Sequence, residues 1–326
     1  MSLLDVKNLE VTFRGTVAGE SVRAVRGIGF AVERGECVGL VGESGCGKSS
    51  VAHAIVGLVE PSGGNVAIDG ESWQPGHGVR ARFARKAQLV FQDPYGSLNP
   101  RMKLGATLKE VLHVHPPESD EGSRGDRVSE LLSMVELDPD LAARYPHELS
   151  GGQRQRFGIA RALAVNPSLL VADEPVSALD VSVQVQILNL LREVVVSRNL
   201  GCLFIAHDLA AVRYLCDRVM VMYLGRIVES GSCDAVFANP SHPYTQSLLN
   251  AVPDIEKGLR HRGRAPALLE GEVPSAISKI PGCAFHPRCP SKQLICEQEA
   301  PPETTVEGDQ VSCCHFAKDV RGAFAP

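Results

Sequence analysis

The chain has 326 residues, which is enough for one large α/β domain with an appendage or for two modest domains. Hydrophobic residues make up 44% and charged residues 22% of the sequence, and this balance excludes a chain that is disordered throughout. The 33 basic and 38 acidic residues give a net charge of −5, which argues against a basic face that grips nucleic acid regardless of sequence.

The sequence also argues against a membrane span. The longest apolar run, Val219–Leu224, is far shorter than the about 20 residues that a membrane-spanning helix needs. Residues 1–10 are strand-like and charged, without the apolar core of a signal peptide. We therefore expect a cytosolic chain, in which the ten cysteines need a reason other than disulfide formation.

Short apolar runs alternate with helical patterns over the first two thirds of the chain. A helix is predicted over Ser49–Leu58, and another over Arg154–Ala164. The runs interpreted as strands are Leu9–Phe13, Glu36–Val41, Leu169–Ala172, Cys202–Ala206 and Val219–Tyr223. This alternation predicts an α/β fold with a mostly parallel sheet flanked by helices.

Composition divides the chain further. Residues 94–165 are helix-rich and polar, which predicts a helical insertion in the α/β core. After about Gly231, proline, glycine, arginine and cysteine become frequent. We therefore expect one domain over residues 1–235, which contains the insertion, and a small cysteine-rich C-terminal region over residues 236–326.

A glycine-rich segment follows the strand at Glu36–Val41. Residues Gly42–Ser49 fit the phosphate-loop pattern G-x-x-x-x-G-K-[ST]. Its glycines let backbone N–H groups curl around an anion, and the next helix points its positive end at the same anion. Lys48 would contact the terminal phosphates and the Ser49 hydroxyl would bind Mg²⁺. The strand before and the helix after favour this interpretation over a simple glycine turn.

Two carboxylates follow the strand at Leu169–Ala172. The end of a parallel strand brings Asp173 and Glu174 to the sheet edge where the phosphate loop lies. Asp173 would hold Mg²⁺, and Glu174 would polarise the attacking water. A solvated strand end is the alternative, and the phosphate loop upstream favours the functional interpretation.

A second glycine motif, Leu149–Gln153, precedes the helix predicted at Arg154. Ser150 is a natural N-cap, and the two glycines expose backbone donors at the start of a helix. Taken alone, this pattern favours a plain helix cap over a second anion site.

Together these motifs resemble the nucleotide-binding subunit of ABC (ATP-binding cassette) transporters, over about residues 1–250. The order is that of the family: phosphate loop, glutamine loop at Gln92, LSGGQ signature at Leu149–Gln153, acidic strand, D-loop at Ser177–Asp180 and switch histidine at His207. The resemblance implies a P-loop ATPase in which Glu174, His207 and Gln92 are catalytic and Gln92 also reaches Mg²⁺.

The same resemblance implies a set of ATP-binding residues. Phe13 stands where the family places an aromatic residue on adenine, although a core phenylalanine at a strand end is a serious rival. In the family, ATP is held between two cassettes, so the signature of one chain binds the γ-phosphate on the other. The implied residues are Phe13, Gly42, Ser44, Gly45, Gly47, Lys48, Ser49, Ser50, Gln92, Ser150, Gly151, Gly152, Gln153, Asp173 and Asp180.

Two further segments, Phe91–Pro100 and Asn239–Gln246, are similar to the ATPases of dipeptide and oligopeptide importers. This implies a peripheral subunit on the cytoplasmic face of the membrane, with two permeases, a second cassette that is a paralogue, and an extracytoplasmic solute-binding protein as partners. A related importer for another solute such as nickel is the alternative. A soluble ABC ATPase acting on ribosomes or DNA fits less well, because this chain has one motif set and is not basic.

Five cysteines lie close together in the C-terminal region. Their spacing contains no C-x-x-C knuckle and does not choose between zinc, an iron–sulfur cluster, free thiols and cysteines that staple a dimer. The segments around Cys283–Pro290 and Cys314 resemble those of importer ATPases, some of which bind a [4Fe–4S] cluster. By that resemblance the cluster ligands are Cys283, Cys289, Cys296 and Cys314, and Cys313 is an extra neighbour.

Overall fold

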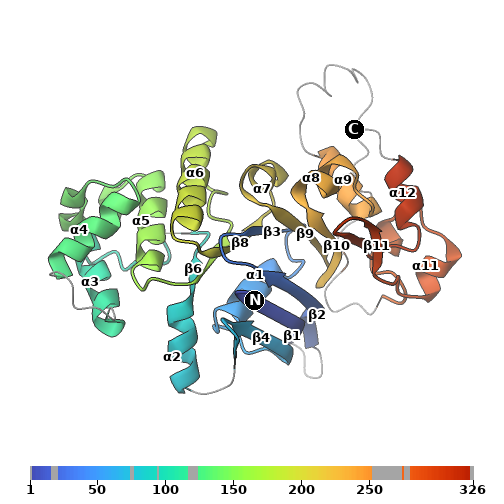
Figure 1. The fold of residues 1–326 in the computed structure, drawn as a ribbon, viewed down its shortest axis with the longest axis horizontal. Coiled ribbons are helices and arrows are strands. Elements are labelled where there is room, and N and C mark those ends of the chain that lie inside the picture. The colour runs from blue at the N-terminus through green and yellow to red at the C-terminus, as the bar shows by residue number, and fades with distance from the viewer. Residues whose placement is uncertain are drawn as a thin grey trace.

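The computed structural model describes residues 2–15, 21–73, 77–93, 95–116, 124–251, 274 and 280–323. Its centre is an eight-stranded sheet of order β11-β12-β10-β9-β3-β8-β7-β6 (Figure 1). The five strands from β9 to β6 run parallel, which confirms the predicted parallel core. These five are β3 (Cys37–Val41), β6 (Ala87–Val90), β7 (Leu169–Asp173), β8 (Gly201–Ala206) and β9 (Arg218–Tyr223).

Alternate residues of the parallel strands face two separate hydrophobic cores. In β7, Leu169 and Val171 pack into one core, and Leu170 and Ala172 pack into the other. Such a strand is buried on both faces, which is why its sequence is continuously apolar. The second face is covered by α6 (Val181–Ser197), α7 (Leu209–Leu215), α8 (Cys233–Ala238) and α9 (Pro243–Ala251).

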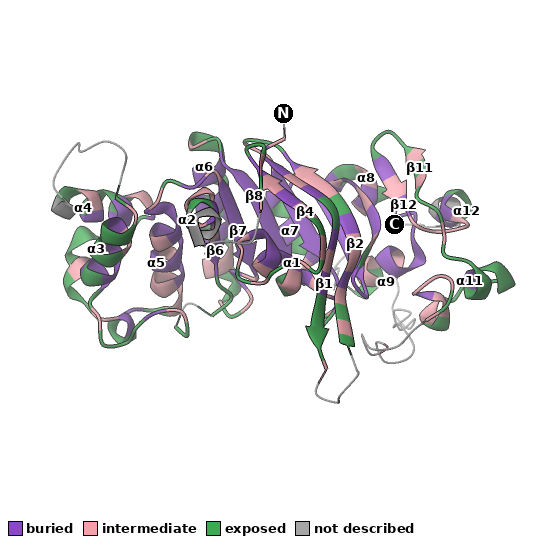
Figure 2. Ribbon diagram, turned by 90° about the horizontal axis from the view of Figure 1, so that it is seen from below, coloured by how far each residue is buried: buried purple, intermediate pink, exposed green. Residues whose placement is uncertain are grey.

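The first face carries α1 (Lys48–Ile55) and a separate antiparallel sheet of order β2-β1-β4-β5. The sequence predicted a strand at Leu9–Phe13, which lies within β1, but not this second sheet. Figure 2 shows its strands beside the core sheet, with buried, half-buried and exposed residues mixed along them. Its strands are β1 (Leu4–Arg14), β2 (Ser21–Val32), β4 (Gly63–Ile68) and β5 (Glu71–Ser72).

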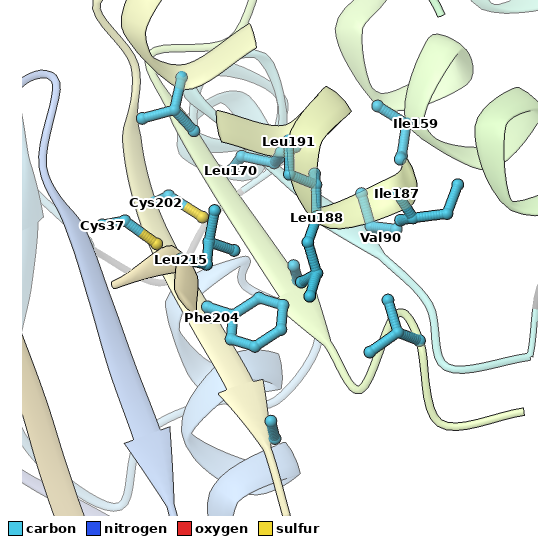
Figure 3. Packing of buried hydrophobic residues seen from close by; sticks show 14 of the residues in the cluster. Cys37, Val90, Ile159, Leu170, Ile187, Leu188, Leu191, Cys202, Phe204 and Leu215 are labelled. Atoms are coloured by element: carbon cyan, nitrogen blue, oxygen red, sulfur yellow. The ribbon is translucent and has the colours of Figure 1, made fainter. Parts of the chain in front are cut away.

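The segment predicted as a helical insertion contains only helices and turns where it is described; residues 94 and 117–123 lie outside the described ranges. Ile159 of its last helix packs against Ile187 of α6 beside the core sheet (Figure 3). Its helices are α3 (Leu104–Val114), α4 (Arg124–Met134), the short 3₁₀ helices η1 (Pro139–Ala143) and η2 (Pro146–Glu148), and α5 (Gly151–Leu163). Helix α2 (His77–Lys86) precedes β6.

One predicted helix boundary was wrong. The helix expected over Ser49–Leu58 ends at Ile55, because Gly57 adopts a φ of +76° that an α-helix cannot contain. The helical pattern over Arg154–Ala164 belongs to α5, which begins directly after Ser150, so the N-cap predicted at Ser150 is confirmed. The Ser150 hydroxyl accepts the Gln153 N–H, and the Gln153 side chain accepts the Ser150 N–H.

The C-terminal region adds strands to the core sheet. β12 (Gln310–Ser312) pairs with β10 (Arg226–Ser232), and β11 (Thr304–Glu307) pairs with β12. Beneath this pairing the buried Glu229 carboxylate accepts the N–H groups of Ser241 and His242 and the side-chain amide of Gln310. The remaining elements are η3 (His286–Arg288), α11 (Leu294–Gln298) and α12 (Ala317–Ala323).

Candidate nucleotide-binding and catalytic site

The phosphate loop, Gly42–Ser49, joins the end of β3 to the start of α1. Gly47 has a φ of +111°, and a Cβ atom there would lie 2.2 Å from the carbonyl oxygen of Ala24. A Cβ on Gly42 would lie 2.2 Å from the carbonyl oxygen of Met222. Strands β2 and β9 therefore press on the loop from outside, and glycine is a steric requirement at both positions.

Lys48 is almost fully buried, at 5% exposure. Its Nζ atom donates to the carbonyl oxygens of Gly42, at 2.8 Å, and of Glu43, at 3.2 Å. The ammonium group thus lies over its own loop, while the neighbouring Ser44, Gly45 and Ser49 are exposed and Ser50 is half-buried. A positive charge beside open backbone at a helix start suits an anionic ligand.

Asp173, the last residue of β7, lies beside the loop. It is 7% exposed, and its Oδ1 atom has no hydrogen-bond partner among the described residues. Burial raises the pKa of Asp173, and a hydrogen bond with the Ser49 side chain opposes that rise. A buried, unpartnered carboxylate oxygen next to a hydroxyl provides the hard oxygen donors that Mg²⁺ prefers, so these residues fit that ion.

Three polar side chains meet where neighbouring parallel strands end. Gln92 follows β6, Glu174 follows β7 and His207 follows β8. The Oε2 atom of Glu174 accepts the Gln92 amide at 3.0 Å and lies 3.1 Å from the His207 Nδ1 atom. Of the three residues predicted to be catalytic, Glu174 therefore contacts both of the others, because carboxyl ends of adjacent parallel strands share one sheet edge.

The backbone of Glu174 is in the left-handed region, with a φ of +47°. Its N–H donates to the carbonyl oxygen of Ile205 at 2.9 Å, which holds the turn against β8. Non-glycine residues in this conformation cost about 1–3 kcal/mol and concentrate at functional sites. The strain adds an independent sign that Glu174 is held for a purpose.

The signature residues Ser150–Gln153 do not join this cluster. They begin α5, and their side chains form the reciprocal cap described above. A Cβ on Gly152 would lie 2.6 Å from Val183 of α6, so the signature packs beside the D-loop end of that helix. Figures 1 and 2 show α5 set apart from α1, so the signature glycines lie away from the phosphate loop of their own chain.

Asp180 and Phe13 are both exposed. Asp180 stands at the N-cap of α6 without a side-chain hydrogen bond to that helix end. Phe13 is 39% exposed in β1, opposite Val22 of β2. The alternative of a core phenylalanine is therefore wrong, and the ring is free to offer a stacking face.

A large cavity of about 880 Å³ opens beside the cluster, between α1, α3, α5 and β6. Gln92, Ser49 and Asp173 line its floor. Phe91 and Arg161 line its wall, with the Arg161 guanidinium 5.8 Å from the Phe91 ring centroid. Gln92 thus faces both the carboxylate cluster and an open groove.

The four cysteines matched to a cluster line one small cavity of about 20 Å³, together with His286 and His315. Burial raises the pKa of Cys289 to about 11 and that of Cys314 to about 12. Among the described residues, however, no group of three or more His, Cys, Asp or Glu side chains is placed to hold a metal ion. The sulfur donor set fits an iron–sulfur cluster chemically, but the cavity has room for about one water, so a cluster requires these segments to open.

The sequence analysis missed two residues at the phosphate loop. The Glu43 N–H donates to the Tyr244 hydroxyl at 2.9 Å, and the Glu43 carboxylate receives two hydrogen bonds from Arg288 at 2.6 and 3.0 Å. Tyr244 lies in the Asn239–Gln246 segment that the resemblance singled out, so that segment was the available signal. Arg288 likewise lies in the Gly282–Pro290 segment of that resemblance, but the resemblance was read there for its cysteines alone.

No helix within the described part of the chain is long and apolar enough to span a membrane. The family described as ABC transporter matches residues 25–177. The family described as oligopeptide/dipeptide transporter, C-terminal region, matches residues 228–296.

Named proteins and solved structures agree with these matches. The oligopeptide transport ATP-binding protein AppF of Bacillus subtilis is 45% identical over 300 residues, covering 90% of each chain. OppF of Salmonella typhimurium, with the same description, is 47% identical, covering 86% of this chain and 84% of its own. The dimeric post-hydrolysis structure of the ATP-binding cassette MJ0796 with ADP and Pi has a TM-score of 0.63 and 28% identity, covering 71% of this chain and 98% of the other.

The fold and the site define a P-loop ATPase of the ATP-binding cassette class. Within it, the chain belongs to the family of ABC transporter ATP-binding proteins that carry the oligopeptide/dipeptide transporter C-terminal region.

Proposed function

We propose that the chain is the ATP-hydrolysing subunit of an ABC importer for di- or oligopeptides. The observation that carries the catalytic part is the meeting of Gln92 and His207 on the Glu174 carboxylate, beside a buried Asp173 oxygen without a partner. The names of relatives at 42–47% identity, which are oligopeptide and peptide transport proteins, support the transported solute.

In this proposal the phosphate loop binds the phosphates of ATP through its backbone N–H groups and Lys48. Gly42, Gly45 and Gly47 keep the loop close to the ligand, and Ser44 and Ser50 lie in its reach. Ser49, Asp173 and Gln92 would hold Mg²⁺, which supplies charge neutralisation at the β- and γ-phosphates. Phe13 offers its exposed ring to adenine.

Hydrolysis needs a water held for attack on the γ-phosphate. The Glu174 carboxylate, oriented by the Gln92 amide and the His207 ring, accepts a proton from that water or orients it. Both neighbours contact one carboxylate oxygen, Oε2. His207 would exchange this contact for the γ-phosphate when ATP binds.

A complete site needs a second cassette. Ser150, Gly151, Gly152 and Gln153 of one chain would complete the γ-phosphate site of the other, with Asp180 at the interface between them. The separation of α5 from α1 within this chain supports that arrangement, as does the dimeric state of the MJ0796 cassette. We expect a paralogous cassette as the partner.

The further partners are two membrane permeases and an extracytoplasmic solute-binding protein, with this chain on the cytoplasmic face of the membrane. The 880 Å³ cavity beside Gln92 is the place where a permease segment would contact the cassette. Gln92 would then report permease movement to the Glu174 carboxylate. Because the chain itself holds no peptide site in this proposal, selectivity belongs to the partners.

The catalytic assignment is tested by Glu174→Gln, which keeps the shape of the side chain but removes the carboxylate. We expect ATP turnover to fall by about 10²–10⁴-fold, because general-base or water-orienting help is lost, while ATP still binds. Glu193→Gln, at an exposed carboxylate of α6 away from the cluster, is the matched control. Turnover at the wild-type rate in Glu174→Gln would remove the role assigned to this residue.

We also propose that Cys283, Cys289, Cys296 and Cys314 hold a [4Fe–4S] cluster. Support comes from the four sulfur donors that line one cavity. In a cluster each thiolate binds a different iron, so its ligands are spaced more widely than those of one zinc ion. Cys313 lines a different cavity and its Sγ atom lies 3.4 Å from the carbonyl oxygen of Ile227.

Two adjacent cysteines provide the test. After anaerobic purification we expect about four irons and four sulfides per chain, a content that Cys314→Ser lowers and Cys313→Ser retains. Zinc without sulfide, or equal loss in both variants, would contradict the cluster assignment.

A further inference from the structure

The C-terminal region makes a direct ion pair with the phosphate loop. Arg288 lies between Cys283 and Cys289, and its guanidinium donates twice to the carboxylate of Glu43, the second residue of the loop. Two parallel hydrogen bonds from a planar guanidinium to one carboxylate fix the relative orientation of the two groups as well as their distance. Residues 245 positions apart in sequence are thus held in one geometry.

The ion pair is enclosed rather than exposed. The Arg288 side chain is 5% and the Glu43 side chain 25% exposed. The guanidinium lies 6.0 Å from the Tyr223 ring centroid, and Tyr223 packs edge-on against Phe285 of the same cysteine-bearing segment. When one partner of such a pair is removed, the other charge stays buried without compensation, so the surroundings must rearrange.

The other groups of Glu43 are also engaged. Its N–H donates to the Tyr244 hydroxyl, and its carbonyl oxygen accepts Lys48 Nζ at 3.2 Å. Glu43 therefore links the C-terminal region on one side to the phosphate-binding lysine on the other. A shift of its side chain would move the carbonyl oxygen that holds Lys48.

We propose that Arg288 is a positioning residue for the phosphate loop, and that through Glu43 the segment carrying Cys283 and Cys289 sets the affinity of the site for ATP. The inference rests on the proposed binding of ATP at this loop. Arg288 touches no substrate itself; it holds Glu43, which holds the loop in the conformation that accepts phosphates.

The coupling is reciprocal by thermodynamic linkage. If an ordered Cys283–Cys289 segment favours ATP binding, bound ATP favours the ordered segment by the same factor. Opening of that segment, which a cluster in the small cavity also requires, would therefore be felt at the phosphate loop. Hydrogen exchange of the backbone amides in this segment reports such opening.

The test compares Arg288→Gln and Arg288→Lys with the wild-type protein as purified. ATP affinity is measured by titration, and KM and kcat by ATP turnover. We expect Arg288→Gln to raise the ATP Kd and KM about tenfold, equivalent to about 1.4 kcal/mol, with kcat changed less than twofold. Arg288→Lys keeps the positive charge but loses the paired hydrogen bonds of the guanidinium. We expect it to raise the ATP Kd and KM about threefold.

The pair Arg218–Glu36 provides the matched control. It is another partly buried ion pair, at 3.0 Å, and it lies at the opposite end of β3 from the phosphate loop. We expect Arg218→Gln to lower thermal stability but to leave the ATP Kd within twofold of the wild-type value. If the two side chains act only through each other, their effects on ATP binding should not add. The ATP Kd of the double variant Glu43→Gln/Arg288→Gln should then be no higher than the higher of the two single-variant Kd values.

A second measurement reads the coupling from the other side. ATP should slow amide hydrogen exchange in the Cys283–Cys289 segment of the wild type but not of Arg288→Gln, while β12 serves as the internal control segment. An unchanged Kd in Arg288→Gln, or equal ATP protection of the Cys283–Cys289 amides in both proteins, would overturn the inference. Failure of the wild type to bind ATP would instead overturn the proposed function.

Discussion

The phosphate loop and the C-terminal region meet at Glu43, yet they are held in place by different kinds of contact. The loop is fixed by close backbone approach, with Gly42 and Gly47 pressed against carbonyl oxygens of β2 and β9. The C-terminal region is fixed by buried polar groups, above all Glu229 and His242. The phosphate loop should therefore be sensitive to substitutions that add a Cβ atom to its glycines. The C-terminal region should be sensitive to pH and to the loss of single hydrogen bonds.

The largest expected effect separates two glycines of one loop. In Gly47→Ala the new Cβ would lie 2.2 Å from the Ala24 carbonyl oxygen, so the loop or β2 must move. We expect ATP affinity to fall more than about 100-fold and stability to fall by about 1–3 kcal/mol. Nucleotide titration and thermal unfolding measure the two effects.

Gly45→Ala is the control for that prediction. Gly45 also has a positive φ, of +79°, but a Cβ there meets nothing within 4 Å. It should suffer the conformational strain without the collision, so its ATP affinity should fall much less. Equal losses in the two variants would show that backbone conformation, rather than the pressure from β2, is what the loop depends on.

The same contrast explains how far the sequence could predict the structure. The phosphate loop, Asp173, Glu174 and His207 follow parallel strands whose apolar runs are continuous, so their common edge was predictable from short segments. The antiparallel sheet was missed, because β1 and β2 pair through irregular registers and alternate only partly between buried and exposed residues.

Long-range docking escaped the sequence analysis for a different reason. Arg288 contacts Glu43 across 245 positions, and Gln310 contacts Glu229 across 81 positions. Neither pair has a local pattern: the Gln310 contact depends on the pairing of β12 with β10, and the Arg288 contact depends on the packing of η3 against the phosphate loop. The sequence shows that the C-terminal region is rich in cysteine. The fold then distinguishes two neighbours, because Cys314 lines the small cavity and Cys313 lines another.

The second prediction concerns pH. Burial lowers the pKa of His242 to about 3, so the folded protein keeps this ring neutral while the unfolded chain protonates it below about pH 6.5. The contribution of the neutral His242 ring to the free energy of unfolding is therefore fully present above pH 6.5 and is lost as pH falls toward 3. Between pH 7 and pH 5 the titration of this group should lower the free energy of unfolding by about 2 kcal/mol.

His242→Asn isolates this contribution, because asparagine does not titrate and can still accept the Tyr244 N–H that His242 Nδ1 accepts at 3.1 Å. The comparison also removes the opposing effect of Glu229, whose pKa is raised by burial in both proteins. Urea unfolding at pH 7 and pH 5 should show the wild type losing about 2 kcal/mol more than the variant. The exposed His113→Asn should follow the wild type, and parallel losses in wild type and His242→Asn would contradict the prediction.

The smallest expected effect is at the Tyr244 hydroxyl, which accepts the Glu43 N–H at 2.9 Å. Tyr244→Phe keeps the ring packing against Tyr223 and Phe285 but leaves that N–H without its acceptor. A lost hydrogen bond of this kind costs about 0.5–1.5 kcal/mol, and because it lies in the phosphate loop we expect about a three- to fivefold rise in the ATP Kd.

Tyr214→Phe is the matched control, since the Tyr214 hydroxyl contacts Asn189 on the exposed surface between α7 and α6. It should leave the ATP Kd unchanged. If Tyr244→Phe lowered stability while its ATP Kd stayed at the wild-type value, the hydroxyl would serve only to dock the C-terminal region, and the effect of that region on ATP binding would be assigned to the ion pair with Arg288. If the Kd rises as expected, two separate groups of Glu43, its N–H and its carboxylate, both carry the contact between the regions.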